Sequence, residues 1–220
     1  MELGFNDLID RIPTNIHART KTFMTKNIAI FRPEKYIVGQ KMRMEDYHFI
    51  IFHSTPPLAM IGDREFQFKK GSLVSLEPKT EITVYPNESN QLCQYVSICV
   101  NKNFMDKIAS ETRGSNIIRF DKLESTYSRQ LLEAINNFEH ELSNFGNKYP
   151  VMIESIATQI AFLLLRDSLP DSLGHSVMGN KDDSYLMRAI DYMRTYYSSN
   201  ITIEDICQEI YLSPSHFKRL

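Results

Sequence analysis

The chain has 220 residues, a net charge of −2 at pH 7 and a pI of about 6.3. This length allows one good hydrophobic core and indicates a second folded part. The slightly acidic charge excludes a protein that is basic overall, so contact with nucleic acid would require a small, locally basic segment.

Cysteine content and hydrophobicity indicate the compartment. Cys93, Cys99 and Cys207 are too few for a disulfide framework and show no metal-binding spacing. The first residues contain neither a basic n-region nor an apolar h-region, and the longest apolar runs, such as 160–165, are far shorter than the ~20 residues of a membrane span. We therefore expect a reduced, soluble, cytoplasmic protein without membrane contact.

Residues 28–100 predict a β-rich region. Short apolar or β-branched runs alternate with turn residues, and this regular spacing indicates a sandwich or a closed barrel. Gly62-Asp63 predicts a tight hairpin turn. The expected strands are Ile28–Phe31, Lys35–Val38, Tyr47–His53, Leu58–Ile61, Glu65–Phe68, Leu73–Leu76, Ile82–Tyr85 and Leu92–Val100.

From residue 101 the sequence changes to helical periodicity. Asn101 is a good N-cap for a short first helix. Apolar residues at helical spacing predict two longer helices, one over 131–142 and one over 152–165, separated by Gly146. Because the last helix is apolar around much of its circumference, we expect it to be covered on two sides.

A segment rich in Ser, Gly and Asp, 170–183, marks a domain boundary. The expected organisation is a first domain, 1–169, a linker, 170–183, and a second domain, 184–220. One face of a helix opens the second domain, formed by Leu186, Ala189, Ile190, Met193 and Tyr197.

The second domain continues with a short helix. Thr202 and Asp205 have the spacing of a capping box at its start. The turn that follows is predicted at Tyr211-Leu212. The apolar face of the helix is supplied by Ile203, Ile206, Cys207 and Ile210.

Another helix begins directly after this turn. Ser213 is a strong N-cap and Pro214 fits the first helical position, where its missing N–H is not needed. Phe217 and Leu220 then face inward at a spacing of three. The remaining positions are Ser215, His216, Lys218 and Arg219, which are the residue types that contact bases and phosphates from a recognition helix.

Three segments together resemble the first helix-turn-helix of AraC-type transcription regulators. They are Ile190-Asp-Tyr-Met-Arg194, Tyr197-Ser-Ser-Asn-Ile-Thr-Ile-Glu-Asp-Ile206 and Leu212-Ser-Pro-Ser-His-Phe-Lys-Arg-Leu220. The β-rich region, especially Gly71-Ser-Leu-Val-Ser-Leu-Glu-Pro78, is similar to the cupin-like effector domain that precedes it in many members. The resemblance implies an α+β fold, with a cupin-like β-barrel or jelly roll, dimerisation helices and an all-α partial helix-turn-helix.

The resemblance also implies a DNA-binding regulator whose barrel binds an effector and thereby changes the affinity for DNA. It places Ser215, Lys218 and Arg219 at positions that face the groove, with His216 beside them, and it implies a homodimer through the helix at 151–165. The family's second helix-turn-helix is not in these 220 residues, so we expect the chain alone to bind operator DNA weakly or not at all. Two departures from the family are Cys207, at a position that is usually Ala, and Tyr211, in the turn where Gly or Asn is frequent.

A small cupin enzyme, an isomerase or a dioxygenase, is the alternative. It would need two or three His and a carboxylate that converge on a metal inside the barrel. The candidates are His48, His53, Glu77 and Glu81, but His48 and His53 lie five apart in one predicted strand and so point to opposite faces. We expect no metal, no cofactor and no catalytic residue.

A barrel without a metal can still hold a small molecule. The predicted effector-binding residues are Arg43, Tyr47, His48, Met60 and Tyr95, and further lining residues are Met42, Met44, Phe49 and Phe66. Arg43 and His48 are the polar groups available to a carboxylate or a hydroxylated effector. The remaining alternative is a regulator whose barrel only dimerises or docks a protein, and a barrel filled solidly by side chains would favour it.

Overall fold

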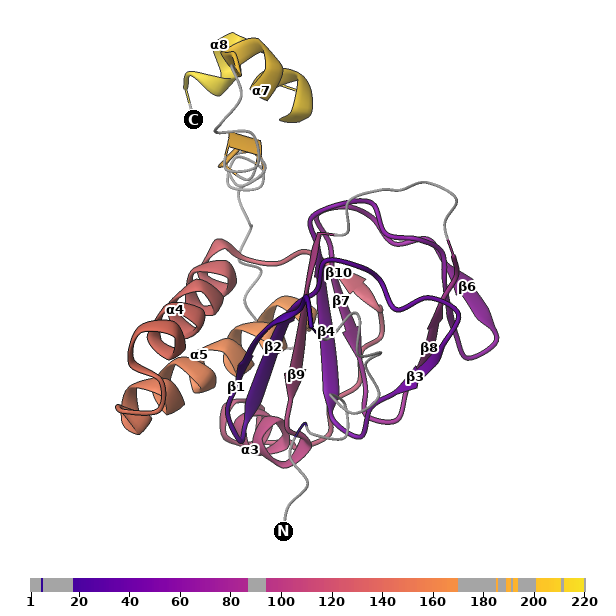
Figure 1. Ribbon diagram of the computed structural model, residues 1–220, viewed down its shortest axis with the longest axis vertical. Helices are drawn as coiled ribbons and strands as arrows, with labels where there is room; N and C mark the ends of the chain where they lie inside the picture. The colour runs from indigo at the N-terminus through magenta and orange to yellow at the C-terminus, as the bar shows by residue number, and fades with distance from the viewer. Residues whose placement is uncertain are drawn as a thin grey trace. The chain divides into compact units, whose positions relative to one another are not determined.

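The computed structural model describes residues 18–86, 94–169, 201–210 and 212–219, together with Phe5, Tyr185, Ala189, Ile190, Tyr192 and Met193. The chain divides into two compact units, Met1–Gly174 and His175–Leu220 (Figure 1). The first unit contains two antiparallel sheets followed by helices, so the predicted α+β class is confirmed. The linker predicted at 170–183 lies outside the described residues.

The larger sheet has six strands in the order β1-β2-β9-β4-β7-β10. β4 lies near its centre, where Ile50 is opposite Ser97 of β9 on one side and Val74 of β7 on the other. The strands are β1 Lys21–Met24, β2 Ile28–Arg32, β4 Tyr47–Phe52, β7 Leu73–Leu76, β9 Tyr95–Val100 and β10 Glu124–Ser125.

The smaller sheet has four strands in the order β3-β8-β5-β6. Its hairpin turns at Gly62-Asp63, as predicted: Ile61 is opposite Arg64, and Gly62 has a φ of 58°, which favours glycine. The strands are β3 Lys41–Arg43, β5 Ala59–Ile61, β6 Arg64–Phe66 and β8 Glu81–Val84.

The predicted strands differ from these in two ways. The segment 35–38 is not a strand, and the prediction there was wrong. Sequence periodicity also missed β1, β3 and β10, which all lie at sheet edges. The first residues of the strand predicted at Leu92–Val100 lie outside the described residues.

Three helices complete the first unit: α3 Lys102–Arg113, α4 Arg129–Phe145 and α5 Pro150–Ser168. The predicted N-cap of α3 is confirmed, because the Asn101 side chain accepts a hydrogen bond from the Phe104 N–H at 3.2 Å. α4 and α5 pack against each other; α4 lies beside β1, and α5 runs across the sheet toward β10 (Figure 1).

The two faces of the larger sheet have different neighbours. The helices cover one face: the Ser75 hydroxyl hydrogen-bonds to that of Ser168 in α5 at 2.6 Å, and Arg32 pairs with Glu139 of α4 at 2.6 Å. The other face packs against the smaller sheet, in a core of Ile50, Phe52, Ala59, Phe68, Val74, Leu76 and Ile82. Successive residues of each strand therefore enter different environments.

α5 packs against α4, α3 and β10, and its second half is buried around most of its circumference, whereas its first turn is exposed. Ile160 and Leu164 are fully buried, whereas Val151 is 82% exposed and Met152 is 53% exposed. Phe162 is exposed on the same helix. The covering on two sides that the sequence predicts is thus present in the second half of the helix, and among the described residues the first turn stays uncovered.

The second unit contains α7 Ile203–Ile210 and α8 Pro214–Phe217. Its small core joins Ala189, Ile206 and Ile210, with Phe217 packed against them. Ile203 was predicted to belong to the apolar face, but its side chain is 42% exposed because it opens the helix. Leu186, Tyr197, Tyr211 and Leu220 lie outside the described residues.

Candidate functional site

A cavity of about 100 Å³ lies between the two sheets of the first unit. A single water molecule needs roughly 10–15 Å³, so the interior of this unit is hollow rather than filled by side chains. The residues that line it on strands are Phe31, Met42, His48, Ile50, Phe52, Ala59, Ile82, Val84, Tyr95 and Ser97, and those between strands are Thr20, Pro33, Tyr36, Ile37, Met44, Pro56, Pro57 and Phe68.

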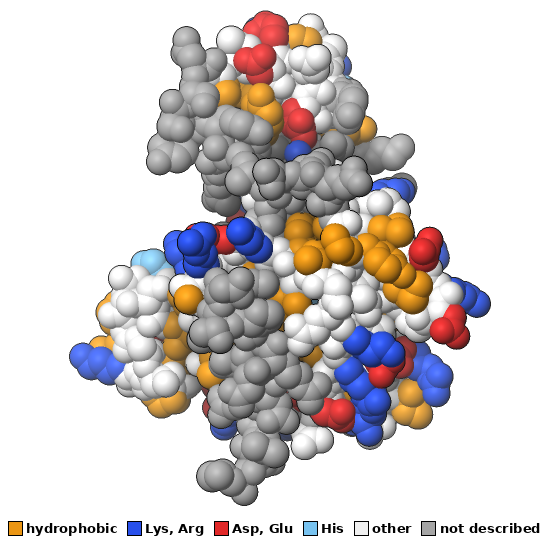
Figure 2. Space-filling model, turned by 45° about the vertical axis from the view of Figure 1, so that its right-hand side comes forward, with side chains coloured by type: hydrophobic (Ala, Val, Ile, Leu, Met, Phe, Trp, Pro, Cys, Tyr) orange, Lys and Arg blue, Asp and Glu red, His pale blue; other side chains and the backbone are white. Residues whose placement is uncertain are grey.

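The cavity wall is apolar with a few neutral polar groups. His48 is the principal one: its Nε2 hydrogen-bonds to the Ser97 hydroxyl at 2.8 Å, and its Nδ1 is buried without a hydrogen-bond partner among the described residues. None of the described residues on the wall is Lys, Arg, Asp or Glu. The outer surface of this unit, in contrast, shows charged side chains of both signs (Figure 2).

The electrostatic setting keeps the His48 imidazole neutral. Burial lowers its pKa to about 4, since the protonated form would lose its hydration deep inside the sheet sandwich. His48 is partly buried and belongs to the lining of the cavity. At neutral pH, His48 therefore presents an uncharged group that can donate or accept a hydrogen bond.

Two of the five predicted effector-binding residues, His48 and Tyr95, line the cavity, and so do the predicted Met42 and Met44. Arg43 does not: it is half-exposed and pairs with Glu81 at 3.9 Å. It is the strand neighbour of Met42, so its side chain points to the opposite face.

Met60 and Tyr47 are also outside the cavity. Met60 alternates with Ala59 in the same way as Arg43 with Met42, and its sulfur accepts a hydrogen bond from the Tyr85 hydroxyl at 3.6 Å. Tyr47 alternates with His48 and points toward α3. Arg43, Tyr47 and Met60 were predicted to bind the effector, but the structure places all three outside the cavity lining.

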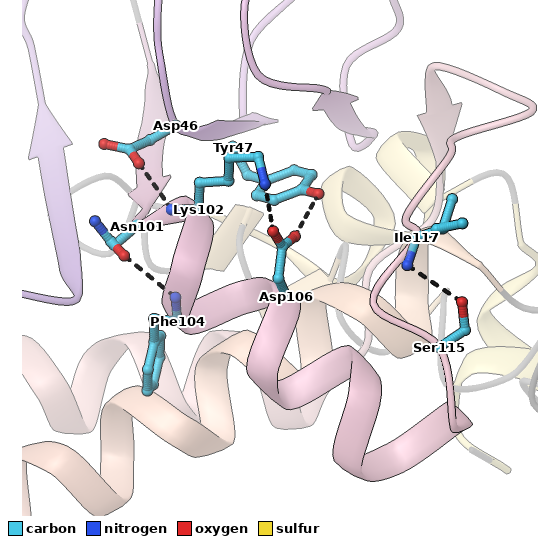
Figure 3. Close-up of polar contacts among 8 residues, drawn as sticks. All are labelled: Asp46, Tyr47, Asn101, Lys102, Phe104, Asp106, Ser115 and Ile117. Atoms are coloured by element: carbon cyan, nitrogen blue, oxygen red, sulfur yellow. Dashed lines mark hydrogen bonds and ion pairs between the residues drawn. The ribbon is translucent and has the colours of Figure 1, made fainter.

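Tyr47 belongs to a polar network that attaches α3 to β4 (Figure 3). Its hydroxyl donates to Asp106 at 2.9 Å, and the Lys102 ammonium pairs with the same carboxylate. The Asp46 carboxylate accepts a hydrogen bond from the Lys102 N–H at 2.7 Å. Burial, and then the Asp106 carboxylate, raise the pKa of Tyr47, so the phenol stays protonated and its role is structural.

Phe49 and Phe66 were also predicted to line the cavity and do not. Phe49 is on the helix face of β4, with its ring 5.7 Å from that of Phe120. Phe66 packs behind the wall, stacked on Phe68. The prediction missed Ser97, which lies two residues after Tyr95 and so on the same face of β9. The period of two was the signal that would have found it.

The four metal-ligand candidates lie apart. Glu77 accepts a hydrogen bond from the Phe120 N–H at 3.1 Å, and Glu81 pairs with Lys41 at 2.9 Å. His53 follows β4 outside the cavity lining, and burial, then the charges of Arg32 and Lys70, lower its pKa to about 4. In the described part of the chain, no three His, Cys, Asp or Glu side chains are grouped closely enough to hold a metal ion.

The helix-turn-helix segment is capped as its sequence predicts. Asp205 accepts hydrogen bonds from the N–H and hydroxyl of Thr202 at 2.8 and 2.7 Å, and the Thr202 hydroxyl accepts one from the Asp205 N–H at 3.2 Å. The two hydrogen bonds that the Asp205 carboxylate accepts from Thr202 lower the pKa of Asp205. Ser213 caps α8 by accepting from the His216 N–H at 3.2 Å.

Three of the four predicted DNA-contacting residues are exposed on or just after α8: Ser215, Lys218 and Arg219. His216 is half-buried, and Phe217 packs toward the small core. The turn before α8 is closed by a hydrogen bond from the Leu212 N–H to the Cys207 carbonyl at 3.0 Å. The geometry thus separates a packing side of α8 from a polar side.

No protein-family profile matches this sequence, and no curated protein matches it either. Within the described residues, no helix is long and apolar enough to cross a membrane.

Solved structures do match. An AraC-like transcriptional activator, CuxR, has 13% sequence identity and a TM-score of 0.42, and the match covers 89% of this chain and 70% of that one. An apo variant of ToxT from Vibrio cholerae has 10% identity and a TM-score of 0.46, with 89% and 74% covered. The EutQ protein of Clostridium difficile has 11% identity and a TM-score of 0.30, with 37% and 66% covered.

Proposed function

We propose that this chain is the sensing and dimerisation part of an AraC-type transcription regulator, followed by its first helix-turn-helix. Residues 1–169 form the sensing domain, 170–183 the linker and 184–220 the DNA-reading segment. The protein acts in the cytoplasm and has no catalytic activity of its own. The observation that carries the proposal is one chain that combines a hollow, apolar sheet sandwich with a capped helix that is followed directly by the exposed cations Lys218 and Arg219.

The DNA contact is assigned to the polar side of α8. Lys218 and Arg219 are cations able to pair with phosphate or with the acceptor atoms of guanine, and the Ser215 hydroxyl lies near the helix start, where base edges are usually reached. His216 is assigned a place beside them. Phe217 holds this helix against Ile206 and Ile210, so the polar side has a fixed orientation relative to α7.

The effector site is the cavity, with His48 and Tyr95 retained from the sequence prediction. A concave apolar space with a few convergent polar groups is the usual form of a small-molecule site. A barrel that serves only for docking would need no such space, so the cavity favours the sensing role over that alternative.

The homodimer is assigned to α5, over 151–165. Val151 and Met152 leave apolar surface exposed at its start, next to Phe145 and Tyr149, whose rings lie 5.8 Å apart. Exposed apolar patches of this kind are typical of interaction surfaces. Val151→Lys combined with Met152→Lys should give a monomer by light scattering at micromolar concentration, whereas the unaltered chain gives a dimer. An unaltered chain that is monomeric at that concentration contradicts the assignment.

The proposed mechanism is a shift between two packings of the same sandwich. β4 and β9 contribute one face to the cavity and the other to the helices, so a ligand that changes the spacing of the sheets changes how α3, α4 and α5 pack. Such a ligand shifts the population only by its difference in affinity for the two packings.

Selection from a random DNA pool tests the DNA-reading role. The purified chain, at low salt, should enrich a short common sequence with weak, micromolar affinity, and Lys218→Ala with Arg219→Ala should abolish the enrichment. Lys107→Ala, which removes an equally exposed cation from α3, is the matched control and should leave it unchanged. Enrichment that survives the loss of Lys218 and Arg219 contradicts the assignment of α8.

A further inference from the structure

We propose that the ligand of the cavity is an uncharged, largely apolar molecule that places one hydrogen-bonding group against Nδ1 of His48. The inference rests on the proposed sensing function and adds the chemical class of the effector. It differs from the sequence-based expectation, in which Arg43 was available to a carboxylate.

The walls specify the body of the ligand. Tyr36 and Tyr95 stack with their ring centroids 4.8 Å apart and their planes 6° apart, and Phe52 stacks on Phe68 at 6.0 Å. These rings form flat apolar walls, completed by aliphatic side chains such as Ile50. A ligand with an aromatic or branched aliphatic body buries its surface here without leaving polar groups unsatisfied.

Nδ1 of His48 specifies the polar group. It is buried and has no partner among the described residues, while Nε2 of the same ring is fixed by Ser97. A buried polar atom without a hydrogen bond destabilises the state that contains it, so a ligand that supplies the missing partner gains more than one that does not. Since Nδ1 has almost no exposed surface in the unliganded protein, a ligand reaches it by turning the ring toward the cavity, and the His48 imidazole is thus the position where one polar group of a ligand is favoured.

The pair of His48 and Ser97 can present either hydrogen-bonding role. If the Ser97 hydroxyl donates to Nε2, then Nδ1 carries the proton and donates to the ligand; if Nε2 donates to Ser97, Nδ1 accepts. The site therefore suits a hydroxyl, an amide or a ketone equally, and it does not restrict the ligand to donors or to acceptors.

A charged group is disfavoured for two reasons. The described lining carries no cation, and the cations of this part of the surface, Lys41 and Arg43, are paired with Glu81 outside the wall. A carboxylate in the cavity would lose its hydration without a counterion. The His48 imidazole would have to be protonated to supply one, and its burial opposes that.

Three probes with similar frames test the inference. They are 3-phenylpropanamide, which is neutral with a polar head, 3-phenylpropanoate, which is charged, and butylbenzene, which has no polar head. Titration of the 220-residue chain, followed by NMR at neutral pH, should show tighter binding of the amide than of the charged 3-phenylpropanoate. Removal of the imidazole should lower the ratio of amide to butylbenzene affinity about five- to tenfold, the contribution of one hydrogen bond.

Two variants separate the hydrogen bond from the shape of the cavity. His48→Leu should lower the ratio of amide to butylbenzene affinity about five- to tenfold and leave the affinity for butylbenzene unchanged or higher. His53→Leu is the matched control: it removes a buried histidine outside the cavity and should not change this ratio. Ser97→Ala keeps the imidazole and should retain binding of the amide, which guards against misfolding of the leucine variant.

The outcomes distinguish this inference from the proposed function. Tighter binding of 3-phenylpropanoate than of the amide, or a ratio of amide to butylbenzene affinity that His48→Leu leaves unchanged, overturns the inference and leaves a ligand-binding cavity in place. No binding of any of the three probes at millimolar concentration overturns both.

Discussion

The two faces of strand β4 share one backbone but pack against different parts of the molecule. Tyr47, Phe49 and Ile51 point to the helices, where Phe49 and Ile51 are fully buried and Tyr47 holds α3 through Asp106. His48, Ile50 and Phe52 point to the smaller sheet, where the packing leaves a cavity. Alternate residues of this one strand therefore serve two purposes: one set stabilises the fold, and the other set borders the proposed ligand site.

The largest expected effect comes from a matched pair of isoleucines. Ile51→Ala should lower the free energy of unfolding by about 4 kcal/mol, because it opens a new void in a filled core, and Ile50→Ala by about 2 kcal/mol, because its side chain already borders an open space. Urea denaturation of both variants measures the difference. Equal losses would contradict the distinction between the two faces.

The next effect is the dependence of stability on pH. The folded-state pKa values of His48 and His53, each about 4, lie below the ordinary value of 6.5, so the unfolded chain binds protons first as the pH falls. Stability is fully present above pH 6.5 and is lost between 6.5 and 4, by about 2 kcal/mol for each histidine at pH 5.

Urea midpoints at pH 7 and pH 5 measure this loss, and His48→Leu should remove about half of it. A loss that His48→Leu leaves unchanged would show that the cavity-facing ring is not held neutral by burial.

The smallest effect belongs to the helix-facing polar group. Tyr47→Phe removes the hydrogen bond to Asp106 and should lower the free energy of unfolding by about 1 kcal/mol, while Lys102 still pairs with the carboxylate. The affinity for 3-phenylpropanamide should not change, in contrast to His48→Leu. A loss of affinity in the Tyr47 variant would place this residue in the ligand site after all.

Sequence patterns correctly predicted the turn and the helix caps, which depend on residues close together in the chain. The Gly62-Asp63 turn and the caps at Asn101, Thr202 and Ser213 depend on residues within a few positions of one another, and all four are present. Strands β1, β3 and β10 were missed because edge strands are half-exposed and short, so pairing with a distant neighbour decides them.

The errors in the candidate site have one cause. Arg43, Tyr47 and Met60 each stand beside a residue that lines the cavity, namely Met42, His48 and Ala59. Adjacent residues of a strand cannot share a face, so strict use of the period of two would have shown that Met42 with Arg43, and Tyr47 with His48, cannot both line the cavity, and it gave no such conflict for Met60. What sequence alone does not give is the register between strands, which brings Ser97 to within 2.8 Å of His48.

The measurement that tests the account most directly uses isoleucine methyl groups on the two faces. With ¹³C-labelled methyls, 3-phenylpropanamide should shift the signals of Ile50 and Ile82, which line the cavity, and leave those of Ile51 and Ile98 on the helix face nearly unchanged. Shifts of Ile51 and Ile98 without shifts of Ile50 and Ile82 would contradict an effector site between the sheets.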